Sequence, residues 1–438
     1  MKTTLWLSMI IALRFLGLFI VLPMLAVYAL EQNGSTPFLV GLAVGGYAIT
    51  QVFFQYPLGK LSDKIGRKKI IVIGLLIFFI GSIICAMSDN IYMLIAGRLL
   101  QGAGAISSAI TAMISDFTKE SERAKAMAVM GGSIAMSFIV SMVAGPMIGG
   151  YFGIEILFEI TAVLAIGAIL IMLFKIPQDN KIEHIFENES NLMSIIKNKE
   201  LFRMNVTMFF HSATMTVAFL VIPLTLISIF TWQKSELWMA YLPSIAAGFI
   251  FMGIAAVLGE KHDKTKQVFI ASIILSIVSF AMFAMASSAS YFIAGMVVFF
   301  IGFMMLEPLL QSTTTKIAKI HERGAALGVF NTVQFLGVFV GGLFGGYLLD
   351  GGDITKLGFI MSAVSVFWLF WVIGMKNPLR AKFLFLNLNE VSGKYKELLK
   401  NKNGVVDFYR NATENTLIIK LDPSKCDEKE IENYLKTK

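Results

Sequence analysis

The stretch from residue 59 to residue 69 reads Gly59-Lys60-Leu61-Ser62-Asp63-Lys64-Ile65-Gly66-Arg67-Lys68-Lys69 and lies between two long apolar segments. Gly59 and Gly66 permit a tight turn between two helices. Asp63 can lie at a helix N-terminus, where the helix dipole favours an anion. Arg67 offers a planar fork to a carboxylate, and Asp116 ends a later apolar segment on the same side. A loop that only carried positive charge would contain the lysines but not this order of Gly, Asp, Gly and Arg.

Apolar segments of this kind recur along the chain. Of the 438 residues, 56% are hydrophobic and 15% are charged, whereas soluble domains have about 45–50% apolar and about 25% charged residues. The segments long enough to cross a bilayer are 5–29, 39–58, 70–88, 91–115, 124–150, 154–175, 201–230, 236–258, 267–286, 290–317, 324–349 and 355–375. Each is expected to be a helix, because an open sheet edge in lipid leaves backbone groups without hydrogen bonds. The sequence therefore predicts an all-α membrane protein with twelve transmembrane helices.

Lysine and arginine residues are concentrated on one side of these spans. The net charge is +8, and the basic residues between spans lie mainly in the loops at 60–69, 119–125, 181–203, 261–266 and 316–323. The opposite loops carry only Lys234 and Lys356. Because basic loops stay in the cytoplasm, we expect a multi-pass protein of the bacterial inner membrane with both termini cytoplasmic. The confinement of the charge to these loops favours membrane lipid as a partner and excludes nucleic acid.

The polar stretch 178–200 divides the spans into two sets of six, at 1–177 and 201–378. The two halves repeat short patterns at equivalent positions. Gly59-x-x-x-Asp63-Lys64 returns as Gly259-x-x-x-Asp263-Lys264, and Glu122-Arg123 returns as Glu322-Arg323. Parallel repeats of this kind are typical of transporters that rock two halves about a central site.

The loop at 59–69 resembles the loop between the second and third helices of the major facilitator superfamily, and the resemblance covers roughly residues 1–378. It implies a fold of two six-helix repeats and a loop that locks the cytoplasmic side shut in the outward-facing state. In that state Asp63 would face the start of the eleventh helix near Gly324, and Arg67 would pair with Asp116. The second-half copy has Lys266 and Gln267 where the later Gly and Arg would stand.

Two further stretches resemble motifs of the same superfamily. Arg98-Leu99-Leu100-Gln101-Gly102-Ala103-Gly104 is similar to a motif whose arginine is implicated in proton coupling. Ser141-x-x-x-Gly145-Pro146-x-x-Gly149-Gly150 is similar to the motif associated with antiporters, with Ser141 in place of the usual first glycine. In physical terms, its glycines allow helices to approach closely and Pro146 allows a kink. This motif is the main reason to expect export rather than import.

Four ionisable residues lie within spans, where such residues are costly and usually functional: Arg14, Arg98, His211 and Glu307. The resemblance implies that their four helices line a central cavity. Glu307 is the predicted proton carrier, because a carboxyl in a cavity of low dielectric can load and release a proton. Arg98 is a fixed charge, and an ordinary histidine titrates near neutral pH. The alternatives are structural: buried hydrogen bonds or pairings for Glu307, His211 and Arg98, and snorkelling of Arg14 toward lipid headgroups.

Residues 381–438 differ in character from the rest of the chain. The patterns predict strands at 383–388, 404–409 and 416–421 and helices at 391–399 and 427–435. This βαββα order indicates a ferredoxin-like module without its final strand, which resembles a type of exporter within the superfamily that carries such a C-terminal domain. So small a module is expected to dock on the membrane part or to associate with another copy. Related folds bind metals through Cys-x-x-Cys, but here only Cys426 is present, so we expect no metal site.

The predicted function is therefore proton-coupled antiport, that is efflux of an unidentified small molecule by alternating access. A proton-coupled nutrient symporter and a non-transporting sensor that signals through its C-terminal domain remain alternatives. An ATP-driven pump is disfavoured because no Gly-x-x-x-x-Gly-Lys-[Ser/Thr] loop is present. The sequence also contains no evident nucleophile, histidine and acid set, so we expect neither an enzyme nor a cofactor.

Overall fold

The computed structural model of the protein describes residues 2–178, 192–319, 322–350, 352–375, 382–392, 395–400, 402–411, 415–423 and 425–436. Within these ranges, twelve helical segments are long and apolar enough to cross a membrane, which confirms the predicted number. The first half contains α1 (Lys2–Ile20), α2 (Leu22–Glu31), α3 (Pro37–Ile65), α4 (Arg67–Ala86), α5 (Ile91–Ala103), α6 (Ser107–Asp116), α7 (Glu120–Phe152) and α8 (Glu155–Lys175). The second half contains α10 (Lys199–Ser228), α11 (Leu237–Lys261), α12 (Thr265–Ala284), α13 (Ala289–Ile317), α14 (Arg323–Leu349) and α15 (Ile354–Ile373), preceded by the short α9 (Leu192–Lys197). Most of the predicted linker, residues 179–191, lies outside the described ranges.

Two predicted spans are each interrupted once. The first span consists of α1 and α2, which meet at Val21. Pro23 in the first turn of α2 accounts for this break, because proline lacks the N–H that a continuous helix needs. The fourth span consists of α5 and α6, and the helix stops at Gly104. A side chain at Gly104 would collide with the backbone of α4 at Gly74, so glycine at this position lets the end of α5 lie directly against α4.

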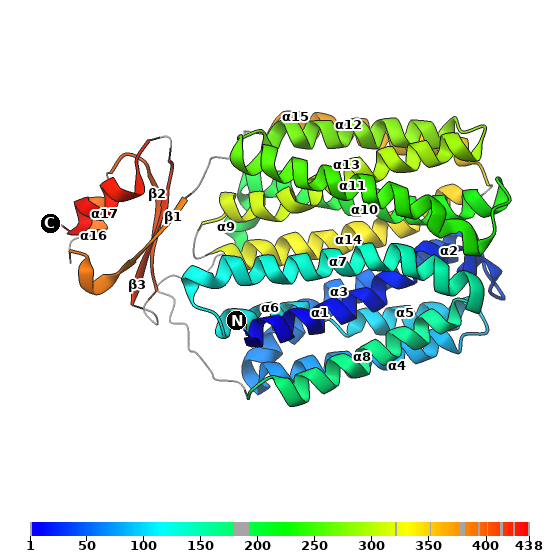
Figure 1. The fold of residues 1–438 in the computed structure, drawn as a ribbon, viewed down its shortest axis with the longest axis horizontal. Coiled ribbons are helices and arrows are strands. Elements are labelled where there is room, and N and C mark those ends of the chain that lie inside the picture. The colour runs from blue at the N-terminus through cyan, green and yellow to red at the C-terminus, as the bar shows by residue number, and fades with distance from the viewer. Residues whose placement is uncertain are drawn as a thin grey trace.

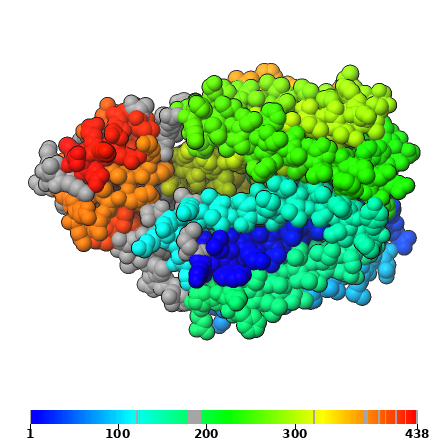
Figure 2. All heavy atoms as spheres, viewed as in Figure 1, coloured from blue at the N-terminus to red at the C-terminus, as the bar shows by residue number. Residues whose placement is uncertain are grey.

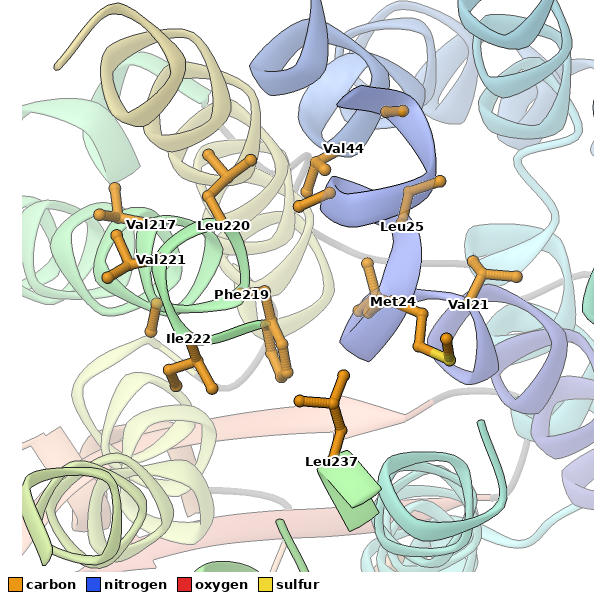
Figure 3. Close-up of a cluster of buried hydrophobic side chains, with 14 of the residues drawn as sticks. Val21, Met24, Leu25, Val44, Val217, Phe219, Leu220, Val221, Ile222 and Leu237 are labelled. Atoms are coloured by element: carbon orange, nitrogen blue, oxygen red, sulfur yellow. The ribbon is translucent and has the colours of Figure 1, made fainter. Parts of the chain in front are cut away.

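The two halves are joined at one membrane face. We call the side that carries the basic loops and the C-terminal domain the basic face, and the other side the opposite face. Near the opposite face, one hydrophobic cluster contains Tyr28 and Phe138 from the first half together with Phe219 and Leu237 from the second. Figure 3 shows side chains around Leu25 facing those around Phe219 across the boundary. The ammonium of Lys234 also pairs with the carboxylate of Glu31 at 2.6 Å, so the halves are held together here by packing and by charge.

At the basic face the two halves separate. One hydrophobic cluster there contains only first-half residues such as Leu7 and Ile110, and another contains only second-half residues such as Met208 and Phe330. In Figure 2 the deeper α14 is visible between α7 and α11, which diverge toward the C-terminal domain. The structure is therefore closed at the opposite face and open at the basic face.

The C-terminal residues form a small α+β domain, as predicted. Its elements are β1 (Lys382–Asn387), α16 (Tyr395–Lys400), β2 (Val405–Asn411), β3 (Thr416–Leu421) and α17 (Glu428–Lys436). The three strands form an antiparallel sheet in the order β1-β3-β2, which is the order expected of a ferredoxin-like module that lacks its last strand. Leu417, Ile419 and Leu421 pack against the two helices on one side of the sheet.

The other side of this sheet faces the membrane helices (Figure 1). The Lys420 ammonium, 5% exposed, donates hydrogen bonds to the backbone oxygens of Lys316 and Ala318, where α13 ends. The guanidinium carbon of Arg323, the first residue of α14, lies 3.9 Å from the centroid of the Phe383 ring. The domain therefore docks on the turn between α13 and α14 of the second half.

Candidate transport site

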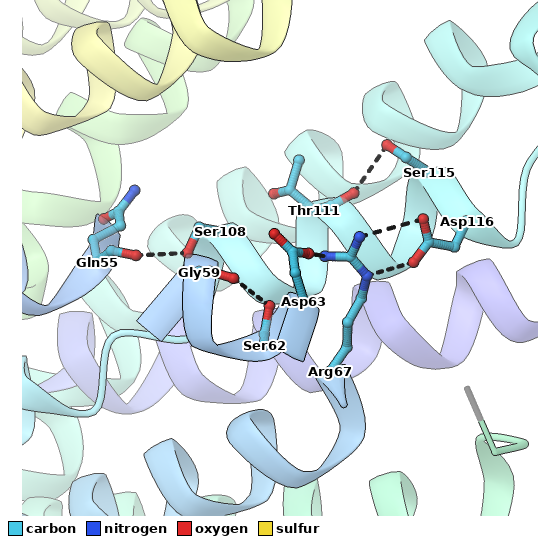
Figure 4. Close-up of polar contacts among 9 residues, drawn as sticks. All are labelled: Gln55, Gly59, Ser62, Asp63, Arg67, Ser108, Thr111, Ser115 and Asp116. Carbon is cyan, nitrogen blue, oxygen red and sulfur yellow. Dashed lines mark hydrogen bonds and ion pairs between the residues drawn. The ribbon is translucent and has the colours of Figure 1, made fainter. Parts of the chain in front are cut away.

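The turn between α3 and α4 holds a group of charged side chains at the basic face (Figure 4). Gly66 has φ = 105°, a left-handed conformation that favours glycine, and this allows the chain to turn between the two helices. Arg67 then points toward α6, where its Nε and Nη2 atoms donate to the two carboxylate oxygens of Asp116. Its Nη1 atom lies 2.9 Å from Oδ1 of Asp63. One guanidinium therefore ties together α3, α4 and α6.

Asp63 lies in the last turn of α3 and not at a helix N-terminus. Its side chain is 60% exposed and pairs with Arg67. The position of Gly324, in the first turn of α14, has nothing within 4 Å of where a Cβ would be. The structure thus brings Arg67 to Asp116 but does not bring Asp63 to the start of α14, in keeping with the open basic face. Gly59 accepts a 2.6 Å hydrogen bond from the hydroxyl of Ser62, within the same turn region.

His211 of α10 and Glu307 of α13 are brought together in the second half. Nε2 of His211 lies 3.0 Å from Oε2 of Glu307. The His211 side chain is 3% exposed and that of Glu307 is 48% exposed, so the carboxyl is accessible from outside the protein core while the imidazole is buried. The His211 ring stacks on Phe303, with centroids 4.3 Å apart and planes 3° apart. This packing fixes the imidazole ring against one side of the carboxylate.

Arg14 lies in the first half, between α1, α3 and α6. Its Nη2 atom donates to Oε1 of Gln51 at 3.2 Å, and its Nη1 atom donates to the hydroxyl of Ser107 at 3.3 Å. The side chain is fully buried, which excludes the expected alternative that it snorkels to the lipid headgroups.

Arg98 is also fully buried and lies against α3. Its Nε atom donates to the backbone oxygen of Ala43 at 3.2 Å, and its Nη1 atom donates to Oε1 of Gln101 at 2.7 Å. The guanidinium carbon lies 4.6 Å from the centroid of the Tyr47 ring. Within the described residues, no hydrogen bond or ion pair joins Arg14 or Arg98 to the His211–Glu307 pair. The two arginines and the His211–Glu307 pair therefore belong to separate hydrogen-bonded groups.

The stretch that resembles the antiporter motif packs α7 against the first helix and against the other half. The hydroxyl of Ser141 donates to the backbone oxygen of Leu16 at 3.1 Å. Side chains at Gly145 and Gly149 would collide with Ile20 and with Met24, respectively. A side chain at Gly150 would collide with the backbone at Ser235, in the second half. Pro146 lies inside α7, which continues through it.

Sequence reasoning missed the uncharged residues that surround the two arginines. Tyr47 and Gln51 lie one turn apart on α3, and Gln55 follows one turn later. A tyrosine and two glutamines at a spacing of four residues in an apolar span are a recognisable signal, since polar side chains inside a membrane usually face protein. Within the described ranges, no group of three or more His, Cys, Asp or Glu side chains could hold a metal ion.

Comparisons with known proteins agree with this architecture. The sequence model of the Major Facilitator Superfamily matches residues 7–342 and 204–403. The chain belongs to the major facilitator superfamily. It is 33% identical to the inner membrane transport protein YajR of Escherichia coli over 99% of this chain and 97% of that protein. It is therefore a multi-pass membrane transporter and not an enzyme.

Two further members of the superfamily have lower identity to this chain. The quinolone resistance protein NorA of Staphylococcus aureus is 30% identical over 78% of this chain and 88% of that protein. Among solved structures, the nucleoside transporter NupG superposes with a TM-score of 0.68 at 18% identity, covering 86% of this chain and 99% of that chain. At that identity the likeness concerns the fold alone.

Proposed function

We propose that this major facilitator protein exports a small molecule in exchange for protons. The observation that carries the proposal is the contact between His211 and the half-exposed carboxyl of Glu307. A carboxyl that faces an open cavity can exchange a proton with water, and a buried imidazole in hydrogen-bond contact can share or orient that proton.

The proposed cycle uses the two faces of the membrane in turn. The basic face is cytoplasmic in this proposal, which follows from its lysine and arginine residues. In the state described here, open to the basic face, Glu307 releases its proton and the cavity takes up substrate. When the halves rock, the basic face closes and the opposite face opens, and Glu307 is protonated again as the substrate leaves. Both termini then lie in the cytoplasm of a bacterial cell, beneath its inner membrane.

In this proposal, the loop at 59–69 and the glycine motif at 141–150 take part in the closing of the two membrane faces. The Arg67–Asp116 pair would keep the first-half helices together, so that Asp63 can engage the start of α14 when the basic face closes. Gly145, Pro146, Gly149 and Gly150 would let α7 close against its neighbours at the opposite face. We take residues 1–177 and 201–378 as the halves that rock, 178–200 as their linker and 381–438 as the cytoplasmic domain.

Relatives support export over import. The 30% identical protein from Staphylococcus aureus is a quinolone resistance protein, and a 27% identical protein from Bacillus subtilis is a multidrug resistance protein. Both names describe resistance to drugs, which is consistent with efflux by those proteins. Direction and coupling for this chain are proposed on this basis together with its antiporter-type motif.

Everted membrane vesicles test the proposal. Respiration acidifies their lumen, and a pH-sensitive dye reports the gradient while a panel of small molecules is added. Antiport predicts that at least one compound raises the lumenal pH only when the protein is present. A symporter predicts no such dissipation in this orientation but proton entry with substrate in right-side-out cells, and that result would replace the efflux assignment.

A further inference from the structure

Two positive charges are buried in the first half without a carboxylate. Arg14 and Arg98 are both fully buried, and their described hydrogen bonds go to neutral groups. Within residues 2–178, the acidic residues lie in turns or within two turns of a helix end. A buried charge without a counter-charge is costly. Within the described residues, the two buried guanidinium groups therefore have no bonded carboxylate as a counter-charge.

Unused hydrogen-bond donors lie at the same place. Nε of Arg14, Nη2 of Arg98 and Nε2 of Gln51 are buried and have no acceptor in the described structure. Arg98 lies against Tyr47 and Arg14 bonds to Gln51, and these two α3 residues are one turn apart. The two guanidinium groups therefore follow one face of α3, at neighbouring turns. Several N–H donors beside two positive charges suit a carboxylate, sulfonate or phosphate, which offers several acceptor oxygens.

The site formed by Arg14, Arg98 and Gln51 lies next to the boundary between the halves. Tyr47, whose ring covers Arg98, also lines a small cavity with Met215 and Phe219 of the second half. Phe335 of the second half packs in the same cluster as Tyr47. Aromatic walls suit a flat apolar body, and a change of the Tyr47 rotamer would open the cavity to the guanidinium group of Arg98.

From this arrangement we infer that the transported substrate is an amphipathic organic anion, with an apolar body between the halves and its anionic group on Arg14, Arg98 and Gln51. The inference rests on the proposed function, because it names the substrate class of that transporter. A lipophilic cation fits less well, since it would face two fixed positive charges while the carboxyl of Glu307 is in contact with His211.

Binding to the purified full-length protein tests the inference with matched probes. Naphthalene-2-sulfonate and the neutral naphthalene-2-sulfonamide differ in charge but hardly in shape, and tetraphenylphosphonium serves as the cation. We expect the sulfonate to bind at least about tenfold more tightly than the sulfonamide, the minimum expected from a hydrogen bond to a charged group. Arg14→Gln and Arg98→Gln should each remove this preference. Arg203→Gln, the same change at an arginine that pairs with Glu200 near the start of α10, should retain it.

The comparison of probes on the unaltered protein decides the matter even if an arginine variant fails to fold, and Arg98→Lys gives a second, charge-conserving variant. Equal binding of sulfonate and sulfonamide, or tighter binding of the phosphonium, would overturn the inference. The vesicle assay separates this from the proposed function. Proton movement driven by lipophilic cations and dependent on Glu307 would leave antiport intact and exclude the anion. Selective sulfonate binding without any Glu307-dependent proton movement would support the anionic substrate and contradict proton antiport.

Discussion

Nε2 of His211 lies 3.0 Å from Oε2 of Glu307, and the two side chains differ sharply in exposure, at 3% and 48%. The imidazole is held by stacking on Phe303, so the half-exposed carboxyl has a rigid hydrogen-bond partner. The pair joins α10 to α13 within the second half. A change of protonation at this contact therefore acts directly on the packing of two helices that border the cavity.

Replacing His211 by glutamine should impair coupling without abolishing the fold. The amide can still hydrogen-bond to Glu307, but unlike the imidazole it cannot take up a proton, so the pH dependence of transport should change. We expect the rate of coupled proton movement to fall by about tenfold or more. The measurement is dye-reported proton movement at a series of pH values. His262→Gln, at an exposed histidine in the turn after α11, is the matched control. An unchanged pH profile would show that the imidazole is only a packing residue.

Substitutions of Arg67 and Asp116 should have non-additive effects, because the two side chains form one ion pair. Arg67→Ala and Asp116→Ala should each lower transport and thermal stability, because each removes the largely buried ion pair that joins α4 to α6. The double variant should be less impaired than the sum of the two, with a coupling free energy of about 0.5–3 kcal/mol. Thermal unfolding of the detergent-purified proteins measures this. Lys60→Ala, in the same loop and exposed, should have little effect. Strict additivity of the two changes would mean that the pair does not stabilise this face.

Gly150→Val should prevent the opposite face from closing. A side chain there collides with the backbone at Ser235 of the other half, and such overpacking costs about 1–3 kcal/mol. Transport should fall, and a cysteine introduced at Leu237 should react faster with a membrane-impermeant maleimide added from that side. Cys85 and Cys426 are first replaced by serine for this purpose. Gly131→Val, on the same helix but with nothing within 4 Å of the added carbon, is the control. Equal labelling in both variants would refute the role of Gly150 in closure.

Docking of the C-terminal domain should strengthen as pH rises above about 8. Burial at the α13–α14 turn lowers the pKa of Lys420 from 10.5 to about 8, with the charge of Arg323 adding to the effect and that of Asp407 opposing it. The docked state therefore binds fewer protons than the free domain between these two pKa values, so docking is weakest below pH 8 and gains strength up to about 10.5. A neutral amine still has two N–H groups for the backbone oxygens of Lys316 and Ala318.

Hydrogen exchange of β3 and of the α13–α14 turn measures this docking. Protection should rise between pH 8 and 10, after correction for the intrinsic exchange rate. Lys420→Met should lower protection and remove its pH dependence, whereas Lys425→Met, an exposed lysine of the same domain, should not. A pH dependence that survives in Lys420→Met would place the titrating group elsewhere.

Much of the fold could be predicted because each relevant signal is local. The apolar spans, the basic loops and the strand at 416–421 are set by the physics of single segments, and the structure has β3 at those residues. The breaks at Pro23 and Gly104 were not predicted, since a hydropathy pattern does not register a proline near a helix start or a glycine that packs on a neighbouring helix.

The candidate site was less predictable. The Arg67–Asp116 contact follows from complementary charges at the ends of neighbouring helices. The pairing of His211 with Glu307, and the separation of both from Arg14 and Arg98, depend on how each helix is rotated. That rotation is set by packing across the whole bundle, as in the approach of Gly150 to Ser235. It therefore cannot be predicted from the sequence of any single span.

The most direct test of the account compares two activities of the Glu307→Gln protein in the same proteoliposomes. With a compound that the vesicle panel identifies, one assay follows proton movement and the other follows exchange of labelled for unlabelled compound at equal pH. If Glu307 carries the proton, the variant should lose coupled proton movement while retaining exchange. Glu159→Gln, at an exposed glutamate in the second turn of α8, should retain both. Proton movement in Glu307→Gln at the rate of the unaltered protein would contradict the account.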